Sequence, residues 1–216
     1  MPPAIKFCGL TRPDDAARAA KLGAGYVGVI LAGGPRALAV ARAREVYAAA
    51  AGEGVAPRRV GVFATGTADS IADAADEAGI DVVQLHCDPD PEMVPQLRER
   101  FRGDIWSVVR TDGDVPEKSY ELFDVSDAIV LDKLDARLVG GTGRSFDWSL
   151  AARWLAQRRP KQLVLAGGLR AANVRDAIQL LRPDVVDVSS GVESSIGIKD
   201  HALMEAFAAA VAGARE

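Results

Sequence analysis

The sequence predicts an α/β fold, a single small (β/α)₈ barrel that spans residues 1–216 as one domain. Eight short apolar runs alternate with stretches of helical periodicity, glycine or proline follows most of those stretches, and no segment is left over for a second unit. Repeated strand–helix alternation indicates a parallel sheet covered by helices, and eight units fit a closed barrel better than an open sheet. Each unit has about 27 residues. The loops must therefore be short, because barrels of this kind typically contain roughly 250 residues.

The predicted strands are five to seven residues long and rich in Val, Ile and Leu, as buried parallel strands are. They are Ala4–Cys8, Gly25–Leu31, Arg59–Phe63, Asp81–His86, Asp104–Arg110, Asp127–Asp132, Gln162–Ala166 and Val185–Ser189. Apolar and polar residues alternate within several of them, as Ile5 and Phe7 do with Lys6 and Cys8. We therefore expect the apolar side chains under the helices and the polar ones inside the barrel, near the strand ends where such barrels hold their sites.

Most of the predicted helices stop at glycine or proline, which is the expected chemistry of a helix end. The helices are Asp14–Leu22, Ala37–Ala51, Thr67–Ala78, Pro91–Arg102, Asp147–Arg159, Ala171–Leu181 and His201–Ala212. The unit after the fifth strand is the weak one. Its helix, Glu117–Val125, is expected to be short or absent.

The composition excludes several classes of function. Hydrophobic residues make up 49% of the chain, which is enough for one sizeable core, and the net charge of −4 gives no electrostatic case for nucleic acid or an anionic membrane surface. The apolar runs are too short and broken to cross a bilayer, and the N-terminus lacks the pattern of a signal peptide. Two cysteines, Cys8 and Cys87, are too few for a disulfide framework. We expect a cytoplasmic protein.

Glycine-rich turns follow the sixth, seventh and eighth strands, at Gly140–Gly143, Ala166–Leu169 and Ser189–Val192. Glycine lets backbone N–H groups approach an anion closely, and barrel enzymes often bind phosphate after strands seven and eight. One such turn would be read as a tight loop, but three together favour a phosphate site. Its expected residues are Gly141, Thr142, Gly143, Gly168, Ser190 and Gly191. A short extra helix over Glu193–Ile198 would direct its N-terminus at the anion.

Two side chains at strand ends are candidates for acid–base chemistry. Cys8 ends the first strand on the polar side, where a thiolate can act as a base or nucleophile. The alternative is a small buried residue that only fills space. Asp132 ends the sixth strand on the same side, where desolvation can make a carboxyl group a general acid, and the alternative is a rim salt bridge with Lys133.

Other polar residues near the predicted mouth are candidates for substrate contacts. Arg36 follows Gly-Gly-Pro after the second strand and can hold a carboxylate bidentately, although alone it would be read as a solvated loop residue. Gln84, His86 and Asp187 are further candidates, and packing inside the barrel is the alternative for His86. The chain has only two histidines, His86 and His201, and no carboxylate cluster at ligand spacing, so a metal site is not expected.

These segments resemble one family, the phosphoribosylanthranilate isomerases of tryptophan biosynthesis. Three residues depart from the usual pattern of that family: Phe7 replaces an aliphatic residue, Cys87 a glycine and Ile196 a proline. The matching segments run from the first strand to the last helix. They are Lys6–Thr11, Gly34–Arg36, Gly61–Phe63, Val83–His86, Leu131–Asp132, Gly140–Gly143 with Phe146–Trp148, Leu165–Leu169 with Asn173–Val174, and Val188–Ser194 with Gly197 and Lys199–Asp200.

The resemblance implies an aldose–ketose isomerase that carries out an Amadori rearrangement. It would convert N-(5-phospho-β-D-ribosyl)anthranilate to 1-(2-carboxyphenylamino)-1-deoxy-D-ribulose 5-phosphate. Asp132 would be the general acid and Cys8 the general base, while Arg36 would bind the anthranilate carboxylate. No cofactor is implied, since an imine is already an electron sink. The expected partner is a phosphorylated small molecule, and the protein is expected to be a monomer or a homodimer.

Three other functions compete with this interpretation. A phosphosugar isomerase of histidine biosynthesis on the same fold uses a carboxylate as its base where this chain has Cys8. An indole-forming barrel synthase needs a lysine acid, and the only lysines at the strands are Lys6 and Lys133. A barrel that binds a phosphorylated ligand without catalysis would keep the glycine-rich turns and lack turnover.

Overall fold

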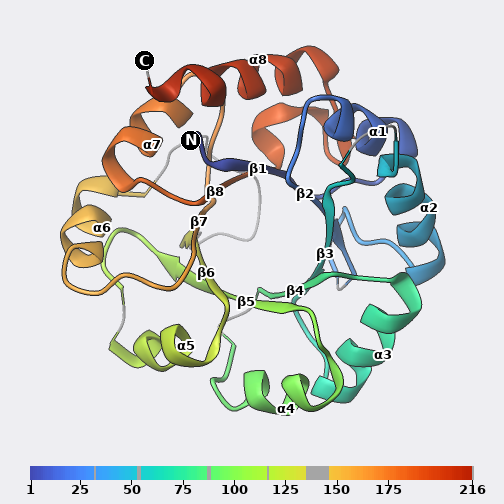
Figure 1. Cartoon of the computed structure of the whole chain (residues 1–216), viewed down its shortest axis with the longest axis horizontal. Helices are drawn as coiled ribbons and strands as arrows, with labels where there is room; N and C mark the ends of the chain where they lie inside the picture. The colour runs from blue at the N-terminus through green and yellow to red at the C-terminus, as the bar shows by residue number, and fades with distance from the viewer. Residues whose placement is uncertain (32, 53–54, 87–88, 116, 135–145, 216) are drawn as a thin grey trace.

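The computed structural model describes residues 1–31, 33–52, 55–86, 89–115, 117–134 and 146–215. Within them, eight parallel strands form a closed barrel in chain order, and pairing of β1 with β8 closes the ring (Figure 1). The strands are β1 (Ala4–Phe7), β2 (Tyr26–Ile30), β3 (Arg58–Phe63), β4 (Val82–Leu85), β5 (Asp104–Thr111), β6 (Ala128–Lys133), β7 (Leu163–Leu165) and β8 (Val185–Val188). Each strand overlaps a predicted one, so the predicted TIM barrel is confirmed.

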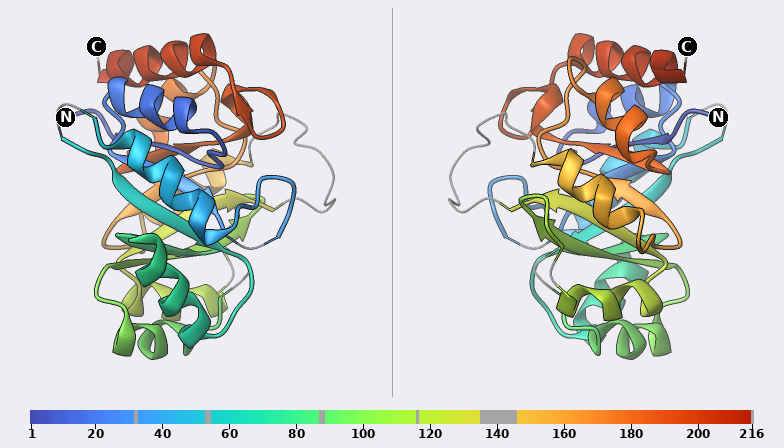
Figure 2. Two further views of the ribbon diagram at one scale, coloured as in Figure 1. Left: turned by 90° about the vertical axis from the view of Figure 1, so that its right-hand side faces the viewer. Right: turned by 90° about the vertical axis from the view of Figure 1, so that its left-hand side faces the viewer.

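Helices surround the barrel on the outside (Figures 1 and 2). They are α1 (Pro13–Lys21), α2 (Val40–Ala50), α3 (Ala68–Ala78), α4 (Met93–Arg100), α5 (Tyr120–Val125), α6 (Trp148–Leu155), α7 (Val174–Leu181) and α8 (His201–Ala212). The weak fifth unit is indeed short: a 3₁₀ turn over Glu117–Ser119 leads into the six residues of α5. Helix α2 begins later than predicted because Ala37 bridges to Ile30, and the N–H of Leu38 donates to the Ile30 carbonyl at 2.9 Å.

The buried side chains form two layers, as the alternation within the strands predicts. The outer layer lies between strands and helices. Phe7 belongs to it and meets Phe207 of α8 edge to face, with 6.3 Å between ring centroids, so the aromatic residue in place of an aliphatic one packs under a helix. The inner layer fills the barrel and includes Tyr26 and Trp106, whose rings meet at 4.8 Å. The polar side chains that point into the barrel therefore lie above a layer of packed apolar side chains.

The segment after β8 differs from the prediction. A helix over 193–198 is wrong: a 3₁₀ turn, Ser190–Val192, leads into an antiparallel hairpin of β9 (Glu193–Ser195) and β10 (Ile198–Lys199). The physical reason is Gly197, whose φ of +78° turns the chain and cannot continue a helix. In Figure 2 this hairpin projects from the end of the barrel away from the N-terminus.

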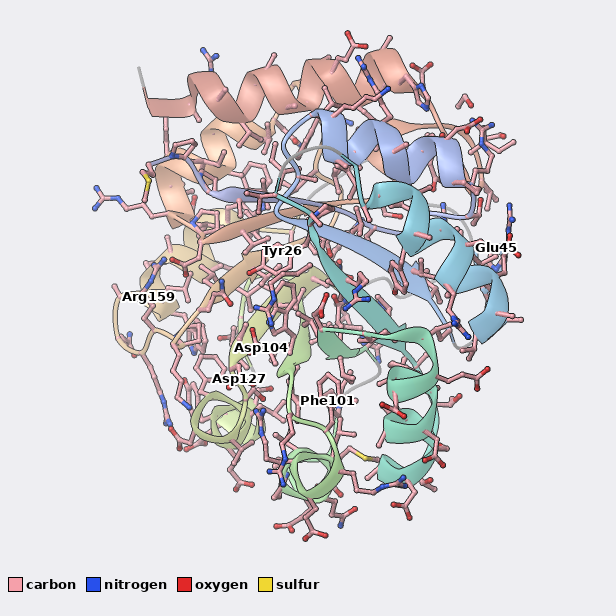
Figure 3. All side chains as sticks on the ribbon, turned by 45° about the vertical axis from the view of Figure 1, so that its right-hand side comes forward. Tyr26, Glu45, Phe101, Asp104, Asp127 and Arg159 are labelled. Carbon is pink, nitrogen blue, oxygen red and sulfur yellow. The ribbon has the colours of Figure 1, made fainter. Side chains whose placement is uncertain are left out.

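Ion pairs link different units at the other end of the barrel, where the strands begin. Arg58 of β3 contacts Asp104 of β5 at 2.5 Å, and Arg98 of α4 contacts Asp127 at 2.5 Å. Both aspartates are labelled in Figure 3. Asp127 also accepts a hydrogen bond from the backbone N–H of Ile105 at 2.7 Å, which ties the start of β5 to the start of β6. These contacts hold the strand starts of different units together.

Among the described residues, no helix is long and apolar enough to cross a membrane.

Candidate active site

A cavity of about 760 Å³ opens at the end of the barrel where the strands stop. Residues on or just after β1, β2, β3, β4, β6, β7 and β8 line it, so segments far apart in the sequence meet there. Nine of the predicted site residues lie in its wall: Cys8, Arg36, Gln84, His86, Asp132, Gly168, Asp187, Ser190 and Gly191. The other three, Gly141, Thr142 and Gly143, lie outside the described residues.

A second cavity, of about 830 Å³, lies at the opposite end of the barrel. It is the larger of the two, but none of the predicted site residues lines it. Its charged residues include Arg59 and Asp81, which already bind each other through two hydrogen bonds of 2.8 and 2.9 Å. The chemistry of the chain is therefore gathered at the smaller cavity.

Cys8 directly follows β1 and points into the barrel at the cavity floor. Gly28 on β2 makes room for it, because a Cβ at that position would lie 3.0 Å from the Cys8 sulfur and 3.2 Å from the Lys6 side chain. Burial raises the pKa of the Cys8 thiol, and the nearby Lys6 ammonium acts in the opposite direction. The resting side chain is thus a thiol beside a cation that favours its thiolate.

Asp132 lies on the cavity side of β6, with 24% of its side chain exposed. Burial raises the pKa of this carboxyl group, and His86 is the largest influence that lowers it. One carboxyl oxygen accepts the backbone N–H of Lys133 at 2.7 Å, and the other lies 3.9 Å from Nε2 of His86. A carboxyl group that is hard to ionise can keep a proton to donate at neutral pH.

Lys6 forms a buried hub that sequence reasoning left without a role. Its ammonium is fully buried and donates to Asp187 at 2.6 Å and to Gln84 at 2.8 Å. Burial alone would lower the pKa of Lys6, but the Asp187 carboxylate raises it, so the side chain stays cationic. The second carboxylate oxygen of Asp187 has no hydrogen-bond partner within the described part of the chain. The signal for Lys6 was its inward position in β1, next to Cys8.

Arg36 binds a carboxylate, and in the structure that carboxylate belongs to Glu193 of the hairpin. Its Nε and Nη2 donate to the two oxygens at 2.8 and 2.6 Å, and buried Lys199 donates to the same carboxylate at 2.9 Å. These two cations hold the pKa of Glu193 below its usual range, although burial acts the other way. Glu193 and Lys199 were missed as site residues, although both lie in segments of the family resemblance.

The loops after β7 and β8 touch at a glycine. A Cβ on Gly191 would lie 1.9 Å from the carbonyl oxygen of Leu169, so no other residue fits between the loops. The backbone N–H of Gly168 has no backbone acceptor among the described residues, and the N–H groups of Ser190 and Gly191 come before the first hydrogen bond of the 3₁₀ turn, which runs from Val192 to Ser189. All three residues line the cavity, so their donors are available to an anion there.

Comparisons with known proteins agree on one family. A family model described as N-(5'phosphoribosyl)anthranilate (PRA) isomerase matches residues 5–210. The N-(5'-phosphoribosyl)anthranilate isomerase of Acidithiobacillus ferrooxidans is 39% identical over 213 residues, with 97% of each chain covered.

Solved structures give the same result. Monomers generated from the dimeric phosphoribosylanthranilate isomerase of Thermotoga maritima superimpose with a TM-score of 0.80, at 32% identity and with 98% of this chain and 99% of theirs covered. A phosphoribosyl anthranilate isomerase in complex with reduced 1-(o-carboxyphenylamino)-1-deoxyribulose 5-phosphate has a TM-score of 0.81, at 30% identity and with 98% and 99% covered.

The protein is therefore an isomerase of tryptophan biosynthesis that converts N-(5-phosphoribosyl)anthranilate to 1-(2-carboxyphenylamino)-1-deoxyribulose 5-phosphate. It is an intramolecular oxidoreductase. By family model, sequence and structure, the chain belongs to the N-(5'-phosphoribosyl)anthranilate isomerase family.

Proposed function

We propose that Asp132 is the general acid of this rearrangement and Cys8 its general base. The observation that carries the proposal is that one cavity is lined by two inward-facing groups, a carboxyl group on β6 that can donate a proton and a thiol after β1 that can accept one as thiolate. Asp132 protonates the ring oxygen of the ribose, and the ring opens to an imine. Cys8, as thiolate, removes the proton from C2 of the sugar, and the resulting enolamine tautomerises to the ketone. The imine is the electron sink, so the sequence of steps needs no cofactor.

The environments of the two groups support this division of labour. Burial raises the pKa of Asp132, which favours its protonated form. Lys6 opposes the effect of burial on Cys8 and stabilises the thiolate at the moment it is needed. An acid and a base held apart on different strands can act on different atoms of one substrate.

Arg36 binds the anthranilate carboxylate through the part of its guanidinium that Glu193 leaves open. Glu193 occupies Nε and one hydrogen of Nη2, while the end-on pair of Nη1 and Nη2 has hydrogens left to donate. A planar guanidinium can serve two carboxylates, one on each of these edges. Glu193 then orients Arg36, and the substrate binds its free edge.

The phosphate binds at the loops after β7 and β8. Backbone N–H groups of Gly168, Ser190 and Gly191 donate to it, and the glycine-rich turn that follows β6 in the sequence adds Gly141, Thr142 and Gly143. Backbone donors without a Cβ in the way form the concave anion sites that phosphates favour.

Asp187 and His86 contact the sugar between these two anchors. The partnerless oxygen of Asp187 can accept a hydrogen bond from a sugar hydroxyl, since a buried carboxylate oxygen left without a donor is costly. His86 lies in the same wall, beside the acid.

The chain acts as one cytoplasmic domain, as a monomer or a homodimer. The relative from Thermotoga maritima is dimeric, which supports the second state. Sedimentation of the purified protein over a range of concentrations distinguishes the two.

Binding of the reduced product analogue tests the residue roles without requiring turnover. The variants Cys8→Ser and Asp132→Asn should bind it with wild-type affinity and fail in catalysis. Arg36→Met should bind it about tenfold or more weakly, because a lost charge-assisted hydrogen bond costs about 1.5–3 kcal/mol. If Cys8→Ser and Asp132→Asn lose affinity as Arg36→Met does, the two groups are binding residues and the proposal is wrong.

A further inference from the structure

A chain of polar contacts crosses the cavity floor from β8 to β6. Lys6 joins Asp187 to Gln84, with 2.6 and 2.8 Å between the bonded atoms. Nε2 of Gln84 lies 3.4 Å from Nδ1 of His86, and Nε2 of His86 lies 3.9 Å from a carboxyl oxygen of Asp132. The proposed acid is therefore connected to a buried ion pair on the other side of the barrel.

The ammonium of Lys6 fixes the orientation of the Gln84 amide. A lysine has three donors and no acceptor, so only the amide oxygen can face it. The amide NH₂ must then face the other way, toward Nδ1 of His86. Gln84 is 2% exposed, so water does not offer its amide another arrangement. The oxygen and nitrogen of a glutamine amide are often hard to tell apart, but here the Lys6 ammonium determines which atom is the oxygen.

The fixed amide in turn selects one tautomer of His86. An NH₂ group at Nδ1 needs a lone pair there, because a proton on Nδ1 would place two donors face to face. The neutral ring then carries its proton on Nε2, the nitrogen that faces Asp132. With Nε2 protonated, the ring offers Asp132 no lone pair and cannot accept its proton.

We propose that Gln84 is a positioning residue that holds His86 in the Nε2–H tautomer, so that His86 cannot take the proton that Asp132 must donate. This inference rests on the proposed role of Asp132 as the general acid. It gives Gln84 a different task from the substrate contact predicted from sequence, since both polar atoms of its amide already face protein groups.

The other charged groups around this pair come from three strands. Lys6 on β1 and Asp187 on β8 act on Asp132 in opposite directions, with Asp187 favouring the protonated carboxyl group. Arg110 on β5 stands in register with Asp132. The contact described at Nδ1 of His86, the nitrogen that decides the tautomer, comes from Gln84.

The test is the tautomer of His86 itself, read from ¹H–¹⁵N correlations of the imidazole ring in protein labelled at histidine. The chain has two histidines, and His201→Gln assigns the signals. Wild type should show the Nε2–H form. In Gln84→Glu the new carboxylate should accept a proton from Nδ1, which moves the ring to the Nδ1–H or doubly protonated form. Gln84→Met, which keeps the Lys6–Asp187 pair, should show both neutral tautomers.

Activity supplies the second readout. In Gln84→Glu, His86 can take the proton of Asp132, so kcat should fall by about tenfold to a hundredfold, within the usual worth of a general acid. The acid limb of kcat/KM should move to lower pH, and affinity for the reduced product analogue should persist. Gln179→Glu, which adds the same charge on the exposed face of α7, is the matched control and should change neither readout.

Each outcome decides one point. An Nδ1–H tautomer in wild type, or an unchanged tautomer in both Gln84 variants, overturns the role of Gln84. A changed tautomer with the expected loss of kcat supports it. A changed tautomer with an unmoved acid limb supports the positioning of His86 by Gln84 and overturns Asp132 as the acid.

Discussion

Both ends of the barrel contain ion pairs between a basic residue and an aspartate, but the two ends differ in how far these pairs are buried. Where the strands begin, the ion pairs are Arg58–Asp104 and Arg98–Asp127, and each of their four side chains is more than a third exposed. Where the strands end, Lys6–Asp187 is 0% and 7% exposed. Exposed pairs are screened and contribute about 0–1 kcal/mol each, whereas a buried pair costs desolvation that its geometry must offset.

The difference separates stability from function. The pairs at the strand starts link different units of the barrel, and in each of them both charges have a partner, so they serve the fold. The buried pair holds Gln84 and leaves one buried oxygen of Asp187 without a hydrogen-bond partner in the described part of the chain. Because burying charge is costly, the buried Lys6–Asp187 pair at the end of the barrel that holds the cavity indicates a role in the chemistry of the site.

Removing the base should have the largest effect. Cys8→Ser should nearly abolish turnover, by about two to four powers of ten, because a serine hydroxyl without a partner is far too weak a base. Circular dichroism checks folding, and kcat of the purified variant is the measurement. Wild-type kcat in this variant would remove Cys8 from the mechanism.

Breaking one ion pair at each end tests the comparison directly. Lys6→Met leaves Asp187 as a buried charge without its cation and should lower the free energy of unfolding by about 3–5 kcal/mol. Arg59→Met at the strand starts leaves Asp81 a third exposed and should cost about 1 kcal/mol or less, with kcat unchanged.

Urea unfolding measures both of these variants. If Lys6→Met is too unstable to purify, Lys6→Met with Asp187→Asn should recover part of the loss, since neither charge is then left alone. Equal costs at the two ends would contradict the distinction between them.

Arg36 should show a smaller effect, confined to binding. Arg36→Met should raise KM by about 10- to 150-fold, the equivalent of about 1.5–3 kcal/mol, and Arg36→Lys should raise it less. Lysine keeps the charge but lacks the planar guanidinium, whose N–H groups can bind Glu193 and a substrate carboxylate at the same time. An unchanged KM in Arg36→Met would leave Arg36 as a partner of Glu193 only.

The pH dependence of kcat/KM should be bell-shaped, with both limbs at higher pH than free aspartate and cysteine would give. Burial raises the pKa of Asp132 and that of Cys8. The active form has Asp132 protonated and Cys8 as thiolate. The fraction of enzyme in this form rises with pH until Asp132 and Cys8 together have lost one proton, near the pKa of Asp132. It falls when both groups have lost their protons, above the pKa of Cys8. An acid limb that persists in Asp132→Asn would assign it to another group.

Much of this site could be predicted from the sequence, because it depends on strand parity. The alternation in β1 and β6 was enough to place Cys8 and Asp132 inside the barrel mouth. The contact of Lys6 with Gln84 spans 78 positions and that of Arg36 with Glu193 spans 157. Such contacts depend on which strands face each other across a closed ring, and no local pattern records that.

The hairpin after β8 could not be predicted for a related reason. The position of 193–198 after the last glycine-rich turn predicts a short helix facing the phosphate, but the turn at Gly197 and the pairing of β9 with β10 give a hairpin. The hairpin brings Glu193 and Lys199 to Arg36, so an error in local structure also hid two residues of the site.

The most direct test of the central claim, that Asp132 donates the first proton and Cys8 removes the second, is a single-turnover isotope effect. Substrate deuterated at C2 reports how far proton removal limits the rate, and single turnover avoids masking by product release. In Asp132→Asn the ring opening becomes slow, so kcat should fall by about two to four powers of ten and the isotope effect should shrink below that of wild type. A larger isotope effect in Asp132→Asn than in wild type would mean that Asp132 assists removal of the C2 proton, and would contradict the assignment of acid and base.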